Sequence, residues 1–229
     1  MISGSSMATL VGAKKGVDVH QGLVDKFSVW GDFKKYSLRE MEGVQWEPLA
    51  LDLYLKEEQR RNAAVYAVSM KDCETFICPS FPLLCSEPDG LLTYTPAVAA
   101  AAATLPALRY TKLVEVKTLG KRKGPGHGLA ELKLLPTHVT MQATVHMLYT
   151  RVAAVDVVYY SKSSSPQQTK VFPMRWDSAL QQRLIERDIP AAVDSYRRVW
   201  LPKFLDHRQR VLRGRATAAG AGADIQALV

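Results

Sequence analysis

Long apolar runs are missing from this 229-residue sequence. No stretch reaches the roughly 20 consecutive apolar residues that a helix needs to cross a membrane. The longest weakly polar segment, residues 96–108, is mostly alanine and contains two prolines, which predicts a connection. Residues 1–7 have neither the positive charge nor the apolar core of a secretory signal. We therefore expect neither a membrane-spanning protein nor a membrane partner.

Cysteine is also scarce, with only Cys73, Cys78 and Cys85. An odd count without a secretory signal does not make a disulfide framework, and it favours an intracellular, reducing compartment. A zinc site would need a fourth ligand, and intervals of four and six residues between the cysteines match no zinc-finger spacing. We expect these thiols to pack as small hydrophobic side chains.

Acidic residues are outnumbered, because 30 Lys and Arg stand against 22 Asp and Glu and give a net charge of +8. Hydrophobic residues make up 47% of the chain and charged residues 23%, as in a soluble globular domain. The positive surplus suits a polyanionic partner such as a nucleic acid, but it is too small to identify one.

Hydrophobic periodicity predicts helices on either side of several strands. Such an order favours an α/β (α+β) fold in which a central mixed β-sheet is flanked by helices. The expected elements are a helix at 38–59, strands at 65–68 and 74–78 on either side of a polar turn at Lys71 and Asp72, strands at 90–95 and 112–118, a helix at 137–149, strands at 153–160 and 170–176, and a helical region at 177–213.

Local signals predict where these elements end. Thr137 and Asp177 are expected to cap the helices that they precede, and Pro190 and Pro202 are expected to bend or break the last helical region. The chain is expected to consist of a partly flexible N-terminal segment at 1–36, a single domain at 37–213 and a flexible Gly/Ala-rich tail at 214–229.

The first predicted helix carries an acidic residue on its apolar face. Glu47 shares that face with Leu51 and Tyr54, because residues four and seven apart lie on one side of a helix. A carboxylate among core-facing side chains is costly unless it is paired or coordinated. We therefore expect Glu47 either to form a salt bridge with a nearby Lys or Arg or to belong to a functional site.

Further acidic groups lie on two predicted strands. Asp89 begins one strand, and Glu115 and Lys117 lie two apart on the next, so their side chains leave the same face while Val114 and Val116 point the other way. Antiparallel pairing would place Asp89 beside Glu115. Two adjacent carboxylates repel each other, and a bound hard divalent cation usually relieves this repulsion. Lys117 is then suited to orient or deprotonate an attacking water and to neutralise a phosphate.

This constellation resembles the signature of the PD-(D/E)XK nuclease superfamily. Two further segments, at 43–54 and 141–159, resemble the helix and the "Q…hM…aDfvvY" segment of its lambda-exonuclease/YqaJ branch. The resemblance covers about residues 43–176 and implies a restriction-endonuclease-like core. The matching positions are Gly43, Glu47, Ala50, Tyr54, Pro88, Asp89, Glu115, Val116, Lys117, Gln142, Met147, Asp156 and Tyr159.

The resemblance implies a Mg²⁺ site, for which Mn²⁺ could substitute. In the branch, the equivalents of Asp89, Glu115 and the Val116 carbonyl ligate one ion. The glutamate of the first helix, here Glu47, helps to hold a second ion or its water. On this interpretation Glu47 is a metal-site group and not a costly core residue.

The resemblance also implies catalytic residues and an activity. Lys117 would position the water nucleophile, and Gln142 would hold Lys117 or the water in place, alongside Asp89 and Glu115. The implied reaction is hydrolysis of phosphodiester bonds from the ends of double-stranded DNA, 5′ to 3′, as in phage or viral recombination and DNA repair. The implied partners are a single-strand-annealing protein and further copies of the chain in a homotrimer.

Residues that contact DNA are less clearly marked. The branch has an N-terminal Arg/Ser segment that holds a 5′-phosphate, and no segment here matches it closely. Basic side chains near residues 34–39 could serve, as could the basic loop at 120–128, and a solvated surface is the alternative for both. The candidates are Lys34, Lys35, Ser37, Arg39, Lys121, Arg122, Lys123 and, one helical turn from Gln142, His146, for which a structural role is the alternative.

Two other functions stay open at this point. The first is a PD-(D/E)XK endonuclease of the structure-specific or restriction type, which would cut covalently closed circular DNA where an end-dependent enzyme would not. The second is a non-catalytic basic DNA-binding module derived from a nuclease.

Overall fold

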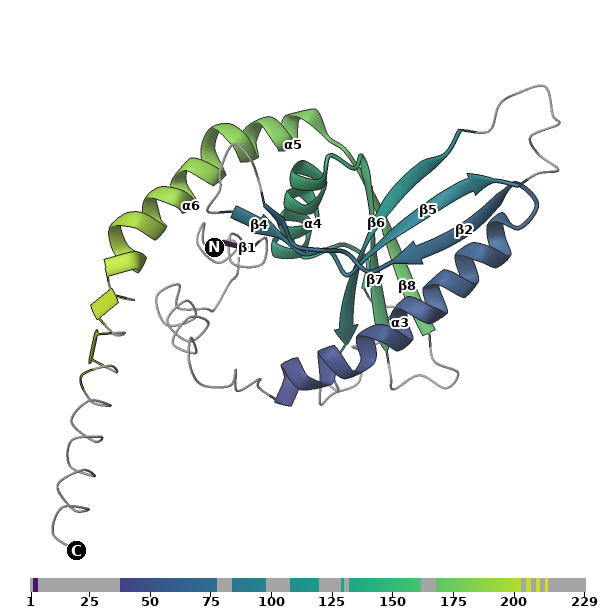
Figure 1. The fold of residues 1–229 in the computed structure, drawn as a ribbon, viewed down its shortest axis with the longest axis horizontal. Helices are drawn as coiled ribbons and strands as arrows, with labels where there is room; N and C mark the ends of the chain where they lie inside the picture. The colour runs from purple at the N-terminus through teal and green to yellow at the C-terminus, as the bar shows by residue number, and fades with distance from the viewer. Residues whose placement is uncertain are drawn as a thin grey trace, which may run out of the picture.

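A computed structural model of the chain has a five-stranded mixed sheet at its centre (Figure 1). The structure describes residues 2–3, 38–77, 84–97, 108–119, 129, 132–161, 168–202, 205–206, 209–210 and 213. The strands follow the order β2-β5-β6-β7-β8 across the sheet. Their bounds are Tyr66–Lys71 for β2, Gly90–Pro96 for β5, Tyr110–Leu119 for β6, Ala154–Ser161 for β7 and Gln168–Arg175 for β8.

One parallel pair makes the sheet mixed. Strands β6 and β7 are parallel, with Glu115 opposite Val157, and the other neighbours pair antiparallel. A parallel pair needs a crossover connection, and helix α4 (Thr137–Thr150) lies between β6 and β7 in the chain. The predicted α/β class with a central mixed sheet is therefore confirmed.

The two faces of the sheet are covered by different helices. Helix α3 (Leu38–Asn62) packs Ala50, Leu51 and Tyr54 onto one face, in a core that includes Val114 and Val116. Helix α4 packs on the other face, against alternate residues of β6 and β7. Strand β7 is buried along its whole length, as expected for a strand covered on both faces. In the described part of the chain, no helix has the length and apolar character needed to span a membrane.

A second, smaller sheet departs from the prediction. It contains three short strands in the order β1-β4-β3, at Ile2–Ser3, Leu84–Ser86 and Phe76–Ile77. The strand predicted at 74–78 is reduced to β3, and it pairs with β4 in this second sheet. The predicted turn at Lys71 and Asp72 is also shifted, because Lys71 is the last residue of β2.

The helix ends agree with the prediction only in part. Pro136 and not Thr137 precedes α4 as its N-cap, and it makes no side-chain cap bond. Asp177 does cap α5 (Ser178–Arg183), since its Oδ1 accepts hydrogen bonds from the Ala179 and Leu180 amides at 2.9 and 3.2 Å.

A helical run continues from α5 through the π-helical turn η2 (Leu184–Asp188), α6 (Ile189–Ser195) and the π-helical turn η3 (Tyr196–Trp200). Pro190 follows the wide turn η2 and stands at the start of α6, where a missing amide costs little. Figure 1 shows this run leading away from the sheet.

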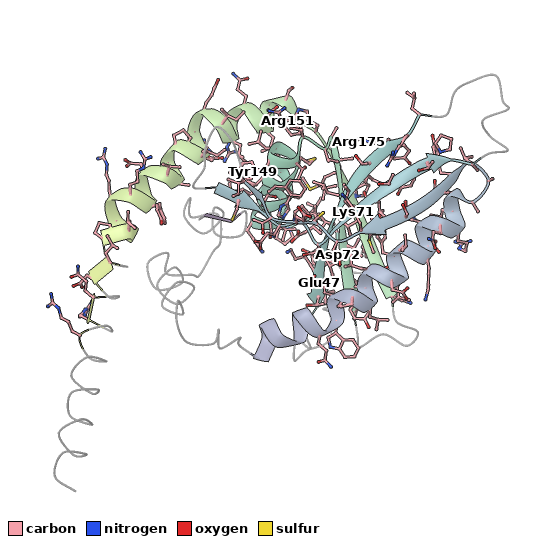
Figure 2. The ribbon with its side chains drawn as sticks, viewed as in Figure 1. Glu47, Lys71, Asp72, Tyr149, Arg151 and Arg175 are labelled. Atoms are coloured by element: carbon pink, nitrogen blue, oxygen red, sulfur yellow. The ribbon has the colours of Figure 1, made fainter. Side chains whose placement is uncertain are left out.

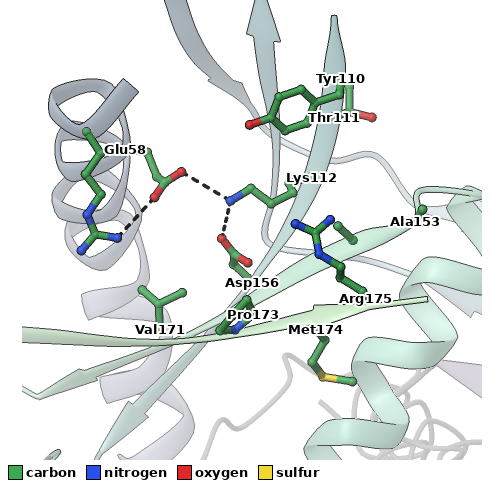
Figure 3. Close-up of a pocket in the computed structure, with 12 residues that line it drawn as sticks. Glu58, Tyr110, Thr111, Lys112, Ala153, Asp156, Val171, Pro173, Met174 and Arg175 are labelled. Carbon is green, nitrogen blue, oxygen red and sulfur yellow. Dashed lines mark hydrogen bonds and ion pairs between the residues drawn. The ribbon is translucent and has the colours of Figure 1, made fainter. Parts of the chain in front are cut away.

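A buried ionic network joins α3 to the sheet (Figure 3). The ammonium group of Lys112 lies 2.6 Å from Asp156 and 3.4 Å from Glu58. The hydroxyls of Tyr54 and Tyr94 donate hydrogen bonds to Asp156 and Glu58, respectively. Each buried carboxylate therefore has both a positive partner and a hydroxyl donor.

Replacing Lys112 by methionine is expected to lower the free energy of unfolding by about 3–5 kcal/mol, because it leaves the buried Asp156 without a counter-charge and Glu58 with Arg61 alone, 3.6 Å away. The exposed pair of Lys56 and Asp52 provides the control, and Lys56→Met should cost at most about 1 kcal/mol. Urea unfolding followed by circular dichroism measures both. Equal losses in the two variants would contradict a stabilising role for the buried network.

Candidate functional site

The register between β5 and β6 brings two predicted acidic residues together. Gly90 pairs with Val114, and the amide of Asp89 donates to the Val114 carbonyl at 3.0 Å. The Val116 amide in turn donates to Oδ2 of Asp89 at 2.5 Å. Asp89 is therefore held beside the segment 114–116 by two hydrogen bonds, and the expected antiparallel pairing is confirmed.

The alternation of side chains along β6 also follows the prediction. Val114 and Val116 are buried against α3, while Glu115 and Lys117 point to the face covered by α4. The ammonium group of Lys117 hydrogen-bonds to Oε1 of Glu115. Gln142, on α4, donates from Nε2 to the same oxygen at 2.7 Å. Strand β6 and helix α4 thus hold Glu115 between them.

Helix α4 contributes a second residue one turn after Gln142. Nε2 of His146 lies 3.0 Å from Oε2 of Glu115, and neither atom has another partner among the described residues. Nδ1 of His146 lies 2.5 Å from Oγ of Ser86, the last residue of β4. Ser86 was not predicted, because nothing in the sequence marked the three-residue strand that carries it.

His146 is a correction to the predicted DNA contacts. Its exposed fraction is 1%, and it lies between Ser86 and Glu115, so its side chain does not reach the surface. Periodicity placed His146 on the same side of α4 as Gln142, which is confirmed. It could not show that this side of the helix is turned toward the sheet.

Glu47 approaches the site from α3. The side chain is half-buried, and Figure 2 labels it in the same region as Lys71, at the end of β2. Burial raises the pKa of Glu47, the negative charge of Glu115 raises it further, and the charge of Lys117 lowers it. Glu47 forms no ion pair or hydrogen bond with any described residue, so the salt bridge considered as an alternative is not found there.

Three carboxylates therefore act on one another around one ammonium group. Burial and the charges of Glu115 and Glu47 raise the pKa of Asp89 well above its ordinary value. Burial also opposes ionisation of Glu115, but Lys117 and His146 outweigh it and hold the pKa of Glu115 below its usual range. The site thus combines one stabilised carboxylate with two that repel it and each other.

The donor set fits a hard divalent cation. Carboxylate and carbonyl oxygens are the ligands that Mg²⁺ prefers, and a divalent charge would relieve the repulsion among Glu47, Asp89 and Glu115. As the side chains stand, the described residues contain no group of three His, Cys, Asp or Glu close enough to hold a metal ion. The reason is that Asp89 and Glu115 are turned toward protein donors, including the Val116 amide and Gln142.

The remaining predicted DNA contacts lie outside this description. Arg39 lies in α3, but its side chain is not among those that the structure describes. The residues that fall wholly outside the described ranges are Lys34, Lys35, Ser37, Lys121, Arg122 and Lys123.

A pocket of about 630 Å³ lies near the start of β6 and is distinct from this site (Figure 3). Its lining includes Glu58, Lys112 and Asp156, whose charges are paired with one another. None of the predicted site residues lines it. We therefore take the groups around Glu115 as the candidate functional site.

Two of the three cysteines, Cys73 and Cys85, lie in the described segments, and neither forms a disulfide with a described residue. Cys85 is buried in β4, whereas Cys73 is half-buried in the irregular segment after β2. Burial raises the pKa of the Cys73 thiol to about 11, so it stays protonated at neutral pH. Cys78 lies outside the described residues.

Comparison with known proteins supports the fold. No family model matches the chain, and no curated protein matches its sequence. An alkaline exonuclease from Laribacter hongkongensis has a similar structure, with a TM-score of 0.55 and 14% identity over 95% of this chain and 94% of that one. The same enzyme in complex with dAMP gives a TM-score of 0.54 and 16% identity over 95% and 94%.

A phage-related exonuclease from Haemophilus somnus 129PT matches 85% of this chain and 92% of its own, with 11% identity and a TM-score of 0.48, too low to carry an argument. At these identities the likeness to the alkaline exonuclease establishes a shared fold. It agrees with the architecture that the family resemblance implied.

Replacing Asp89 by asparagine is expected to stabilise the metal-free protein by about 1 kcal/mol, or about 2–4 °C in Tm, because it removes a buried charge that two carboxylates repel. The amide oxygen of asparagine can still accept from the Val116 amide. Thermal unfolding in EDTA measures the change, with the exposed Asp72→Asn as control. A lower Tm for Asp89→Asn would show that the repulsion inferred at this site is absent.

Proposed function

We propose that the chain is a divalent-metal-dependent DNA exonuclease that hydrolyses phosphodiester bonds from the ends of duplex DNA. The observation that supports it best is the electrostatic cluster of Glu47, Asp89, Glu115 and Lys117, drawn from one helix and two strands, on a fold shared with an alkaline exonuclease. In metal-assisted phosphoryl transfer, carboxylates hold the cation and a nearby positive charge stabilises the phosphate.

The proposed cofactor is Mg²⁺, with Mn²⁺ as a substitute. When bound, the cation would supply Lewis-acid stabilisation of the charge that develops on the phosphate. The groups of this chain proposed to hold it are the carboxylates of Glu47, Asp89 and Glu115 and the carbonyl of Val116. Their oxygen chemistry and the repulsion among the carboxylates support this assignment.

Lys117 acts through its charge in this proposal. Burial lowers the pKa of Lys117, but the carboxylates of Glu115 and Asp89 outweigh burial and raise the pKa above its ordinary value. The ammonium form is thus favoured in the metal-free protein, and this supports orientation of the attacking water over its deprotonation. As the water oxygen bonds to phosphorus it releases a proton to solvent, and as the P–O ester bond breaks the leaving oxygen takes a proton from solvent. The ammonium group stabilises the negative charge that is added to the phosphate during this step.

Gln142 acts on Lys117 indirectly in this proposal. Its amide donates to the Glu115 oxygen that Lys117 also contacts. We assign Gln142 as a positioning residue that fixes Glu115, and through it the ammonium group of Lys117. Holding a charged group in place before the reaction avoids the cost of ordering it during the reaction.

Four further features of the proposal rest on the family resemblance. They are cleavage from 5′ to 3′, a homotrimeric assembly, a single-strand-annealing partner and a role in DNA recombination or repair. An intracellular, reducing compartment is proposed from the cysteine content.

Digestion of end-labelled linear duplexes tests the proposal. With Mg²⁺ the wild-type chain should release labelled nucleotides from linear DNA, leave covalently closed circular DNA intact and lose its activity in EDTA. Duplexes with 5′-phosphate or 5′-hydroxyl ends, labelled at either end, give the polarity. Cutting of the circle would favour the endonuclease alternative, and binding without any cleavage would favour the non-catalytic one.

In the same assay, Lys117→Ala should lower kcat by at least about 10²-fold and leave DNA affinity largely unchanged, because the lysine acts on the developing charge. Lys56→Ala, an exposed lysine on α3, should cleave at the wild-type rate. Unchanged cleavage by Lys117→Ala would remove this lysine from the mechanism.

Lys71 is a further candidate for contact with DNA. It ends β2 opposite Leu91, next to the Gly90 and Asp89 segment, and it is exposed. Its charge and that of Asp89 both act on the Cys73 thiol, which places the two near each other. The sequence predicts only a polar turn at Lys71 and Asp72, and no motif in it distinguishes Lys71 from other surface lysines.

Lys71→Ala should weaken binding of duplex DNA and reduce the slope of log K against log salt by about one, as expected for the loss of one phosphate contact. Lys56→Ala is the matched control, since Lys56 is an exposed lysine on another element. Fluorescence anisotropy at several salt concentrations measures both slopes. Identical slopes for the two variants would place Lys71 outside the DNA path.

A further inference from the structure

A buried chain of polar contacts runs from β4 to β6 through α4. Oγ of Ser86 lies 2.5 Å from Nδ1 of His146, and Nε2 of His146 lies 3.0 Å from Oε2 of Glu115. The exposed fractions of these three residues are 0%, 1% and 1%, respectively. The order of groups is that of a serine hydrolase triad, but a hydroxyl without solvent access cannot meet a substrate, so Ser86 is not a nucleophile.

The contacts determine what each ring atom does. Nε2 of His146 lies 3.0 Å from Oε2 of Glu115, and because a carboxylate oxygen accepts hydrogen bonds, Nε2 is the donor of this pair. Nδ1 shares a hydrogen bond with the Ser86 hydroxyl, which can either donate or accept. Ser86 thereby fixes the orientation of the His146 ring.

The same contacts join two of the three segments that carry the proposed metal ligands, those of Asp89 and Glu115. Ser86 lies three residues before Asp89, at the other end of a short connection. Glu115 lies in β6, and His146 touches both segments from α4. Displacement of either segment would break one of the two contacts of the ring.

Glu115 has its two oxygens held by different groups. Oε1 accepts from Lys117 and from Gln142, while Oε2 has only His146 near it among the described residues. Removing the imidazole would leave a buried carboxylate oxygen without a partner, and the carboxylate could then rotate toward the lysine. The imidazole therefore opposes the pull of Lys117 on this carboxylate.

We propose that His146 and Ser86 are positioning residues that hold the Glu115 carboxylate in the orientation in which it ligates a divalent cation. This inference rests on the proposed function, because it takes Glu115 as a metal ligand. Groups that orient metal ligands typically change metal affinity or activity by 10–100-fold when they are removed.

Calorimetric titration of the full chain with MnCl₂, in the absence of DNA, tests the inference. His146→Leu should weaken Mn²⁺ binding about 10–100-fold. His146→Gln should recover most of the affinity, because its amide nitrogen can stand where Nε2 stood and donate to Oε2. Ser86→Ala should weaken binding in the same direction and by less, since the ring keeps its contact with Glu115.

Met147→Ala is the matched control for a purely structural effect. Met147 is the next residue of α4 and is 1% exposed, but it packs on the apolar core. Its truncation should lower Tm and leave Mn²⁺ affinity unchanged at temperatures where the variant is folded. A loss of affinity in Met147→Ala equal to that in His146→Leu would overturn the inference, as would a His146→Gln variant that recovers nothing.

The remaining outcomes separate the inference from the proposed function. Equal Mn²⁺ affinity in wild type, His146→Leu and Ser86→Ala would overturn the positioning role and leave the exonuclease proposal standing. Weakened binding in these variants, in a chain that cleaves no DNA, would support the positioning role and overturn the exonuclease. A wild-type chain that binds no Mn²⁺ would overturn both.

Discussion

The burial of Glu115 is the constraint on which the site depends. Its exposed fraction is 1%, and a carboxylate at that depth stays ionised only if donors replace its water. Lys117 comes from the same strand, and Gln142 and His146 come from α4. These donors reach Glu115 only if α4 crosses the face of β6 to which Glu115 points, and the crossover from β6 to β7 puts the helix there. The topology of the sheet and the ionisation of one side chain are thus linked.

The two faces of β6 show how a structural charge differs from a functional one. On the α3 face, Lys112 lies between Asp156 and Glu58, Arg61 lies 3.6 Å from Glu58, and tyrosine hydroxyls supply further hydrogen bonds, so two cations match two carboxylates. On the α4 face, Lys117 stands among more carboxylates than it can neutralise, and burial together with the charges of Glu115 and Glu47 raises the pKa of Asp89. Both groups of residues are buried. Only the second has an unbalanced charge, and that imbalance marks it as a place for a cation.

Much of the central sheet could be predicted because its elements are long and regular. An antiparallel pairing of these two strands was expected to place Asp89 beside Glu115, and the register of β5 and β6 agrees. The second sheet could not be predicted, since β3 and β4 have two and three residues, too few to show an alternation. Ser86 was missed for that reason. The contact of His146 with Glu115 depends on the rotation of α4 about its axis, which the periodicity of a helix buried on most sides does not reveal.

Helix α3 carries one glutamate whose charge is neutralised and one whose charge is not. Glu47 and Glu58 are eleven residues apart, about three turns, so they lie on one side of the helix with Leu51 and Tyr54 between them. Glu58 is neutralised by Lys112, whereas Glu47 is half-buried and forms no ion pair among the described residues. A basic residue near Glu47 would remove the cost of burying it, as Lys112 does for Glu58. An unneutralised carboxylate lowers the stability of the folded chain, and proteins retain such costs mainly where function requires them. The packing of Leu51 and Tyr54 fixes the helix on the sheet, and this fixed helix is what holds Glu47 toward Glu115 and Lys117.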